Sequence, residues 1–166
     1  MHSHHSKNNY HARHSAHRVS RPQARPQPPR VSGEAESRFY AGVALDPSPR
    51  IRLEDGLSEL TMRAMDLICP IGMGQRGLIV APPGSGKTTL LKHICQAVSK
   101  SRPEMKRYCL LIDERPEEVT DFRRNIDAEV RWSSSDQPYD HHVATANELM
   151  SQIYREVGSG DNVLLL

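Results

Sequence analysis

The sequence predicts an α/β fold in which helices cover a parallel sheet. Short apolar runs of strand length alternate along the chain with longer segments whose apolar residues recur at helical spacing, and this alternation is typical of parallel sheets with right-handed crossovers. The second observation is a glycine-rich turn that separates one such run from the helical segment after it. The expected strands are residues 78–80, 108–112, 128–132 and 163–166.

Two elements are expected ahead of the glycine-rich turn. Residues 51–53 suit a short strand. Ser58 suits the N-cap of a helix that ends near Cys69, because Pro70 cannot continue it. Three glycines then fall between Gly72 and Gly77, where the backbone either approaches another group closely or simply turns.

Three helices are expected after the turn. The first begins near Lys87 and carries apolar residues at helical spacing. The second begins at Pro116, a residue suited to a first helical turn. The third is expected to be capped by Asp140 and to end at Gly158. The run 108–112 between the first two helices is continuously apolar, as expected of a strand buried on both faces.

The N-terminal segment differs from the rest of the chain. Residues 1–33 contain six His, five Arg, one Lys and four Pro, with no Asp or Glu. Such a composition cannot bury enough apolar surface to offset ordering entropy, so we predict a disordered tail over 1–36. Residues 37–69 are expected to form a linker with a short strand and a helix, and 70–166 the main domain. The tail arginines suit either contact with nucleic-acid phosphates or a solvated linker.

The spacing of the cysteines and the hydropathy of the chain predict its cellular compartment. Cys69, Cys95 and Cys109 are odd in number and have no CxxC spacing, so we expect buried thiols in a reducing compartment. No run approaches 18 apolar residues, and the N-terminus has no apolar signal region. We therefore expect a cytoplasmic protein with no membrane partner.

The segment 77–89, GLIVAPPGSGKTT, predicts a phosphate-binding loop. A strand that turns through glycines into a helix leaves backbone N–H groups pointing at one spot, where phosphate binds. Lys87 is expected to contact the β and γ phosphates of ATP, and the Thr88 hydroxyl to ligate Mg²⁺. Ala81 stands where the strict motif has glycine. The alternative is a chance GKT in an ordinary turn.

A carboxylate follows the strand 108–112. Glu114 and Arg115 lie at its C-terminal end, the edge of a parallel sheet where ligands bind. A carboxylate at this edge can orient or deprotonate a water that attacks the γ-phosphate. Taken alone, the two residues are more simply ordinary loop charges. The neighbouring phosphate loop favours the catalytic interpretation.

Two stretches resemble the Rho family of bacterial transcription termination factors. They are PIGMGQRGLIVAPPGSGKTTLL (70–91) and LLIDERPEEVT (110–120), with weaker similarity over 52–166. The resemblance implies a RecA-like P-loop motor domain of an RNA-dependent, homohexameric ATPase and helicase. It also implies RNA and RNA polymerase as partners. A rotary ATPase subunit shares the phosphate loop, but DERPEEVT favours Rho.

The resemblance also assigns residues. Glu114 is implied to activate the attacking water, and Arg115 to contact the nucleotide. Gly84 departs from the family, which usually has lysine there. The two implied nucleotide-contacting stretches comprise Gly72, Met73, Gly74, Gln75, Arg76 and Gly77, and Gly84, Ser85, Gly86, Lys87, Thr88 and Thr89.

Several parts of the family's proteins are not in this sequence. They are the N-terminal RNA-binding domain, the metal-organising Asp after the strand 163–166, the pore loops and the arginine finger. We therefore expect a fragment whose sheet is cut after about four strands and whose own catalysis is poor. The alternative is an inactive nucleotide-binding module that associates with full-length subunits.

Overall fold

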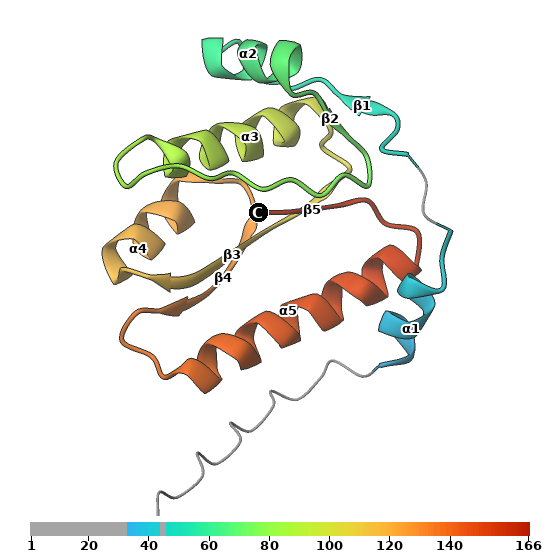
Figure 1. Ribbon diagram of the computed structural model, residues 1–166, viewed down its shortest axis with the longest axis vertical. Coiled ribbons are helices and arrows are strands. Elements are labelled where there is room, and N and C mark those ends of the chain that lie inside the picture. The colour runs from blue at the N-terminus through green and yellow to red at the C-terminus, as the bar shows by residue number, and fades with distance from the viewer. Residues whose placement is uncertain (1–32, 44–45) are drawn as a thin grey trace, which may run out of the picture.

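The computed structural model describes residues 33–43 and 46–166, arranged as helices on both faces of a small sheet (Figure 1). Of the tail predicted to be disordered over 1–36, residues 1–32 lie outside the described residues, whereas 34–36 form the start of a helix, so the prediction is wrong there. The helices are α1 (Glu34–Tyr40), α2 (Leu60–Ile68), α3 (Lys87–Ser101), α4 (Pro116–Asn125) and α5 (Tyr139–Gly158). The strands are β1 (Arg50–Ile51), β2 (Ile71–Gly72), β3 (Lys106–Glu114), β4 (Glu129–Ser134) and β5 (Val163–Leu165).

The main sheet is parallel, and the predicted α/β class is confirmed. Its strand order is β4-β3-β5, with β3 in the centre, and a separate antiparallel pair joins β1 to β2. The parallel sheet has three strands, so the prediction of about four is wrong. Residues 78–80 are the missing strand: they run as exposed coil, and Leu78 and Val80 are 88% and 84% exposed. A strand needs a neighbour's backbone, and 78–80 pairs with none of the described strands.

The central strand divides the core between two layers. Cys109 and Leu111 point to the side covered by α3 and α4, where they pack with Phe122. Tyr108 and Leu110 point to the opposite side and pack against α5. This alternation is the period of two expected of a strand with both faces covered. Figure 1 shows α3 and α4 on one side of the sheet and α5 on the other.

A further apolar cluster joins α2 and β1 to the outer face of α3. Leu53, Met62 and Val98 are at most 1% exposed there. Asp66 of α2 is also buried in this region. Its Oδ2 accepts a 2.9 Å hydrogen bond from the Glu54 backbone, and its Oδ1 lies 3.5 Å from Arg50. The carboxylate therefore ties α2 to the segment that follows β1.

Several element boundaries differ from the sequence-based expectation. Helix α1 was not predicted. The rings of Phe39 and Tyr40 pack against Tyr154 of α5, and the sequence near α1 gives no sign of such a distant contact. The caps expected at Ser58 and Asp140 are wrong, because the N-cap positions fall at Glu59 and Pro138, both in extended conformation without a side-chain cap bond.

The remaining boundaries are shifts of a few residues. The first strand is 50–51 rather than 51–53, and α3 continues to Ser101. Strand β4 includes Ser133 and Ser134, which were expected in a loop. Among the described residues, no helix is long and apolar enough to cross a membrane.

The three cysteines occupy different environments. Cys95 and Cys109 are buried, whereas Cys69 is exposed at the C-cap of α2, contrary to the expectation of three buried thiols. Burial raises the pKa of the Cys95 thiol, and it raises the pKa of Cys109 to about 12. All three thiols are free, as predicted.

We predict that Asp66→Ala lowers the free energy of unfolding by about 1–3 kcal/mol, because it leaves the partly buried Glu54 N–H without its acceptor. Urea unfolding followed by circular dichroism measures the change. The matched control is Asp55→Ala, whose exposed carboxylate lies 3.7 Å from Arg52 and should change stability by less than about 0.5 kcal/mol. Equal effects of the two variants would contradict this role of Asp66.

Candidate nucleotide-binding site

The predicted phosphate loop is a tight turn that depends on two glycines. Gly84 and Gly86 have φ of +75° and +88°, in the left-handed region that favours glycine. A Cβ built on either would meet nothing within 4 Å, so their backbone is open to a ligand. Ser85 donates from its hydroxyl to the Pro82 carbonyl at 2.7 Å, which closes the turn.

The turn leads directly into α3. Gly86 is the N-cap, no side chain caps the helix, and no acidic residue lies in its first turn. The first N–H groups of an α-helix have no partner within the helix, and its dipole favours an anion at this end. Lys87 and Thr89 are exposed and Thr88 is half-buried in this first turn. The arrangement fits a phosphate group.

Glu114 is the last residue of β3, as the sequence predicted. The register between β3 and β4 shifts between Ile112 and Glu114, so Asp113 is an extra residue in the strand. Asp113 has a φ of 59°, which is uncommon for a residue other than glycine. Bulges of this kind redirect side chains and are frequent beside active sites. Here the bulge sets the direction of the half-buried Glu114.

The pKa of Glu114 is raised, first by burial and then by the hydrogen bond and charge of Glu118. The positive charge of Lys87 lowers that pKa and so opposes the shift. Lys87 of α3 and Glu114 of β3 are therefore close enough to interact electrostatically, although 27 positions separate their numbers in the chain. The two residues predicted to be catalytic thus lie within electrostatic range of one another.

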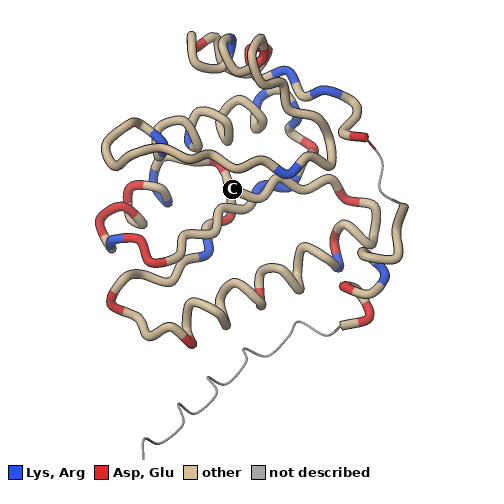
Figure 2. Tube along the Cα trace, viewed as in Figure 1, with Lys and Arg blue, Asp and Glu red and all other residues tan. Residues whose placement is uncertain are grey.

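Arg115 follows as the N-cap of α4, and it is exposed. Pro116 occupies the first turn, as predicted, with Glu117 and Glu118 beside it and Arg123 and Arg124 in the last turn. Figure 2 shows this order of charges along α4. It complements the helix dipole and stabilises the helix that begins beside Glu114.

The other predicted nucleotide-contacting stretch, 72–77, lies elsewhere. Figure 1 shows β2 near the C-terminal end of α3, whereas Lys87 begins that helix. Gly72 is buried, and a Cβ there would lie 2.4 Å from the Pro47 carbonyl oxygen. Met73 packs on the apolar cluster of α2 and α3, and Gln75 accepts a hydrogen bond from the Gly72 N–H. These residues pack and turn the chain there; Gly74, Arg76 and Gly77 are exposed in the connection that follows.

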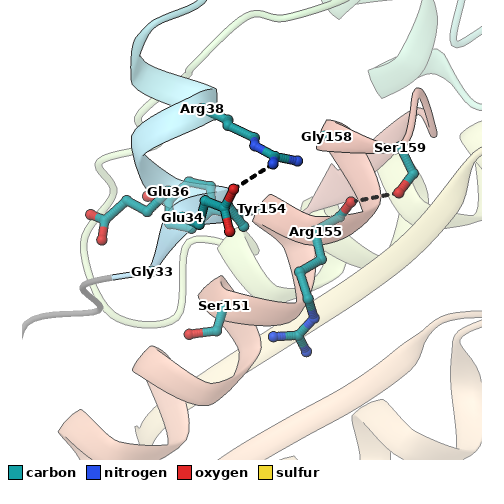
Figure 3. Close-up of a pocket in the computed structure, with 10 residues that line it drawn as sticks. Gly33, Glu34, Glu36, Arg38, Ser151, Tyr154, Arg155, Gly158 and Ser159 are labelled. Carbon is teal, nitrogen blue, oxygen red and sulfur yellow. Dashed lines mark hydrogen bonds and ion pairs between the residues drawn. The ribbon is translucent and has the colours of Figure 1, made fainter.

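A hollow of about 570 Å³ between α1 and α5 is separate from the phosphate loop (Figure 3). Its polar groups are largely satisfied within the protein. Arg38 pairs with Glu34 at 2.5 Å, and the Ser159 hydroxyl donates to the Arg155 carbonyl. No catalytic grouping like that of Lys87 and Glu114 is found among its lining residues.

Thr88 is the one residue predicted to bind a metal. Among residues 33–43 and 46–166, no three His, Cys, Asp or Glu side chains gather in a metal-binding cluster. Mg²⁺ is commonly held by few protein ligands together with substrate phosphates and water. A single threonine hydroxyl at the start of α3 is compatible with that mode.

Comparison with known proteins identifies the family to which the chain belongs. Residues 61–156, from α2 to the last turns of α5, match the ATP synthase alpha/beta family, nucleotide-binding domain. The chain belongs to this family. The matched region contains the phosphate loop, Glu114 and Arg115, so the predicted site lies inside a nucleotide-binding domain.

Within the family, the chain is similar to proteins named transcription termination factor Rho, which confirms the resemblance. It is 44% identical over 128 residues to that of Karelsulcia muelleri and 42% identical over 142 residues to that of Streptomyces coelicolor. These matches cover 77% and 82% of this chain and 34% of each relative. The Mycobacterium tuberculosis protein is 45% identical over 122 residues, 74% of this chain and 20% of the relative. The chain thus spans between about a fifth and a third of these relatives.

We predict that Glu114→Gln stabilises the nucleotide-free protein at neutral pH but not at acid pH. A raised carboxyl pKa means that the folded state binds more protons than the unfolded state. The free energy of unfolding of the wild type therefore falls as the pH rises from the ordinary carboxyl pKa through the raised pKa of Glu114. Glutamine does not titrate, so the variant does not show this fall. Thermal unfolding of both proteins between pH 4 and pH 7.5 measures the difference.

The control is Glu117→Gln, an exposed residue in the first turn of α4, the helix that follows Glu114. It should not gain stability as pH rises, because it removes a charge that favours the helix N-terminus. A Glu114→Gln advantage that is the same at both ends of the pH range would refute the raised pKa.

Proposed function

We propose that this chain binds ATP with Mg²⁺ and forms the nucleotide-binding part of an RNA-dependent ATPase and helicase that acts in transcription termination. The observation that carries the proposal is the juxtaposition of two groups. Lys87 stands at the start of the uncapped helix α3, and the half-buried Glu114 carboxylate lies within its electrostatic reach.

Each group has a distinct role in this proposal. The open backbone of Gly84, Ser85 and Gly86 would hold the phosphates, and Lys87 would neutralise their charge. Thr88 would ligate Mg²⁺, which supplies charge neutralisation between the β and γ phosphates when bound. Arg115, exposed beside Glu114, is available for a further nucleotide contact.

Glu114 is suited to act on the attacking water. A general base works best when its pKa is near the operating pH, and burial with the Glu118 neighbour moves Glu114 in that direction. The bulge at Asp113 holds the carboxylate at the carboxyl edge of the sheet. A water placed between Glu114 and a bound γ-phosphate would lose its proton to this carboxylate.

The wider function rests on the relatives. Their name states transcription termination, and we extend that role, with RNA and RNA polymerase as partners, to this chain. A homohexamer and a cytoplasmic location belong to the same proposal. The free cysteines are in keeping with a reducing compartment.

We predict that Lys87→Ala weakens Mg-ATP binding about tenfold to a hundredfold, because a hydrogen bond to a charged group contributes about 1.5–3 kcal/mol. Titration with a fluorescent ATP analogue in the presence of Mg²⁺ measures it. Lys100→Ala is the matched control: it lies on the same helix, in its last turn, and is exposed. Equal affinities of the wild type and Lys87→Ala would remove Lys87 from the site.

In a version of the protein that also carries the metal-organising Asp, the pore loops and the arginine finger, we predict that Glu114→Gln keeps Mg-ATP affinity and lowers RNA-stimulated ATP turnover by about 10²–10⁴-fold, the usual contribution of general base catalysis. Phosphate release under multiple turnover, with and without RNA, measures it. Unchanged turnover would exclude Glu114 as the base. Binding without any turnover in the wild type would indicate the nucleotide-binding module instead.

A further inference from the structure

A buried serine links the end of β4 to the start of α5. Ser133 is 1% exposed, and its Oγ lies 2.5 Å from Nδ1 of His141 and 2.7 Å from Nδ1 of His142. Two consecutive imidazoles thus converge on one hydroxyl. Neither the serine nor the two histidines was expected to form part of a site.

The hydroxyl has a single proton, which limits the states of the two rings. It can donate to one Nδ1 while it accepts from the N–H of the other. One imidazole must therefore keep an unprotonated Nδ1. If both rings become imidazolium, both Nδ1 atoms are donors, and the buried hydroxyl proton loses its acceptor at a cost. The arrangement is complete only when at least one histidine is neutral.

Other charges face this cluster from each neighbouring element. Asp136, in the connection between β4 and α5, interacts electrostatically with His141. Arg131 of β4 and Glu148 of α5 line a hollow together with His141. Asp140 precedes the two histidines at the start of α5, where the helix dipole disfavours added positive charge.

The cluster adjoins the predicted catalytic carboxylate through the backbone. Ser133 pairs with Ile112 across the sheet, directly before the bulge that carries Asp113. Two residues further on, the Ser135 N–H donates to the Glu114 carbonyl at 3.0 Å. The position of β4 at this edge therefore sets the position of the Glu114 backbone.

We propose that Ser133, His141 and His142 form a proton-sensitive positioning cluster that holds the end of β4 against Glu114 and releases it when both imidazoles are charged. The three residues act through the backbone and touch no nucleotide. The catalytic meaning of the cluster rests on the proposed function of Glu114, whereas its structural effect can be measured without nucleotide.

Amide hydrogen exchange by NMR tests the proposal on the nucleotide-free chain. The reported quantity is the protection of the Ser135 amide relative to an unstructured chain at the same pH, with the Leu110 amide of central β3 as reference. In Ser133→Ala at pH 7.5 we expect Ser135 protection to fall about tenfold, the effect of losing one hydrogen bond, while Leu110 is unchanged. In the wild type we expect a similar fall when the pH is lowered from 7.5 to 5.0.

Two controls isolate the cluster. Ser134→Ala removes a neighbouring hydroxyl that bonds Asp136 at 2.5 Å, and it should keep the pH-dependent fall. Glu114→Gln should keep it too, because the fall belongs to the histidines. Unchanged Ser135 protection in Ser133→Ala, or a pH-dependent fall that persists in that variant, would overturn the proposal.

Nucleotide titration separates this proposal from the proposed function. Ser133→Ala should bind Mg-ATP with wild-type affinity, because the phosphate loop lies on another element. If no protein binds nucleotide, the proposed function fails while the exchange result stands. If binding is normal and the exchange is unaffected, the positioning cluster fails alone.

Discussion

The packing of β3 between two helical layers is the constraint on which the rest of the structure depends. Its side chains alternate between the α3 and α4 side and the α5 side, and both neighbouring strands run parallel to it. Parallel strands place their carboxyl ends at one edge of the sheet. The residue that ends β3 is therefore held beside the helix N-termini and turns of that edge, which is how Glu114 comes close to Lys87.

Local chemistry made several elements predictable. Helix α3 was expected because its apolar residues recur at helical spacing, and the start of α4 because proline suits a first turn. Other elements depend on distant partners. The apolar run at 78–80 has strand composition yet no neighbour to pair with, and α1 is held by aromatic contacts with residue 154. The caps expected at Ser58 and Asp140 are wrong because the helices start after Glu59 and Pro138, so Ser58 lies before its N-cap position and Asp140 lies inside the first turn of α5.

The candidate site also combines features that local sequence predicts with features that depend on distant partners. The glycines of the phosphate loop, Lys87 and Glu114 were identifiable because each belongs to a contiguous motif with a chemical reason for its spacing. The bulge at Asp113 was not identifiable, because the register between two strands depends on both of them and cannot be predicted from either sequence alone. The converging histidines were visible as an adjacent pair, but nothing local indicated that a buried serine eight residues away joins them. The nucleotide contacts expected of residues 72–77 stay a prediction, because a glycine such as Gly72 serves close packing as readily as ligand contact.

The unequal burial of the cysteines has a practical consequence for following this molecule. Thiolates are the reactive form, so a buried thiol with a pKa near 12 hardly reacts with alkylating reagents at neutral pH. Cys69 is the exposed member of the three, at the end of α2 on the far side of α3 from the sheet. A maleimide dye added in stoichiometric amount will therefore mark one position. That position gives a spectroscopic reporter on the chain without any engineered residue and away from the phosphate loop.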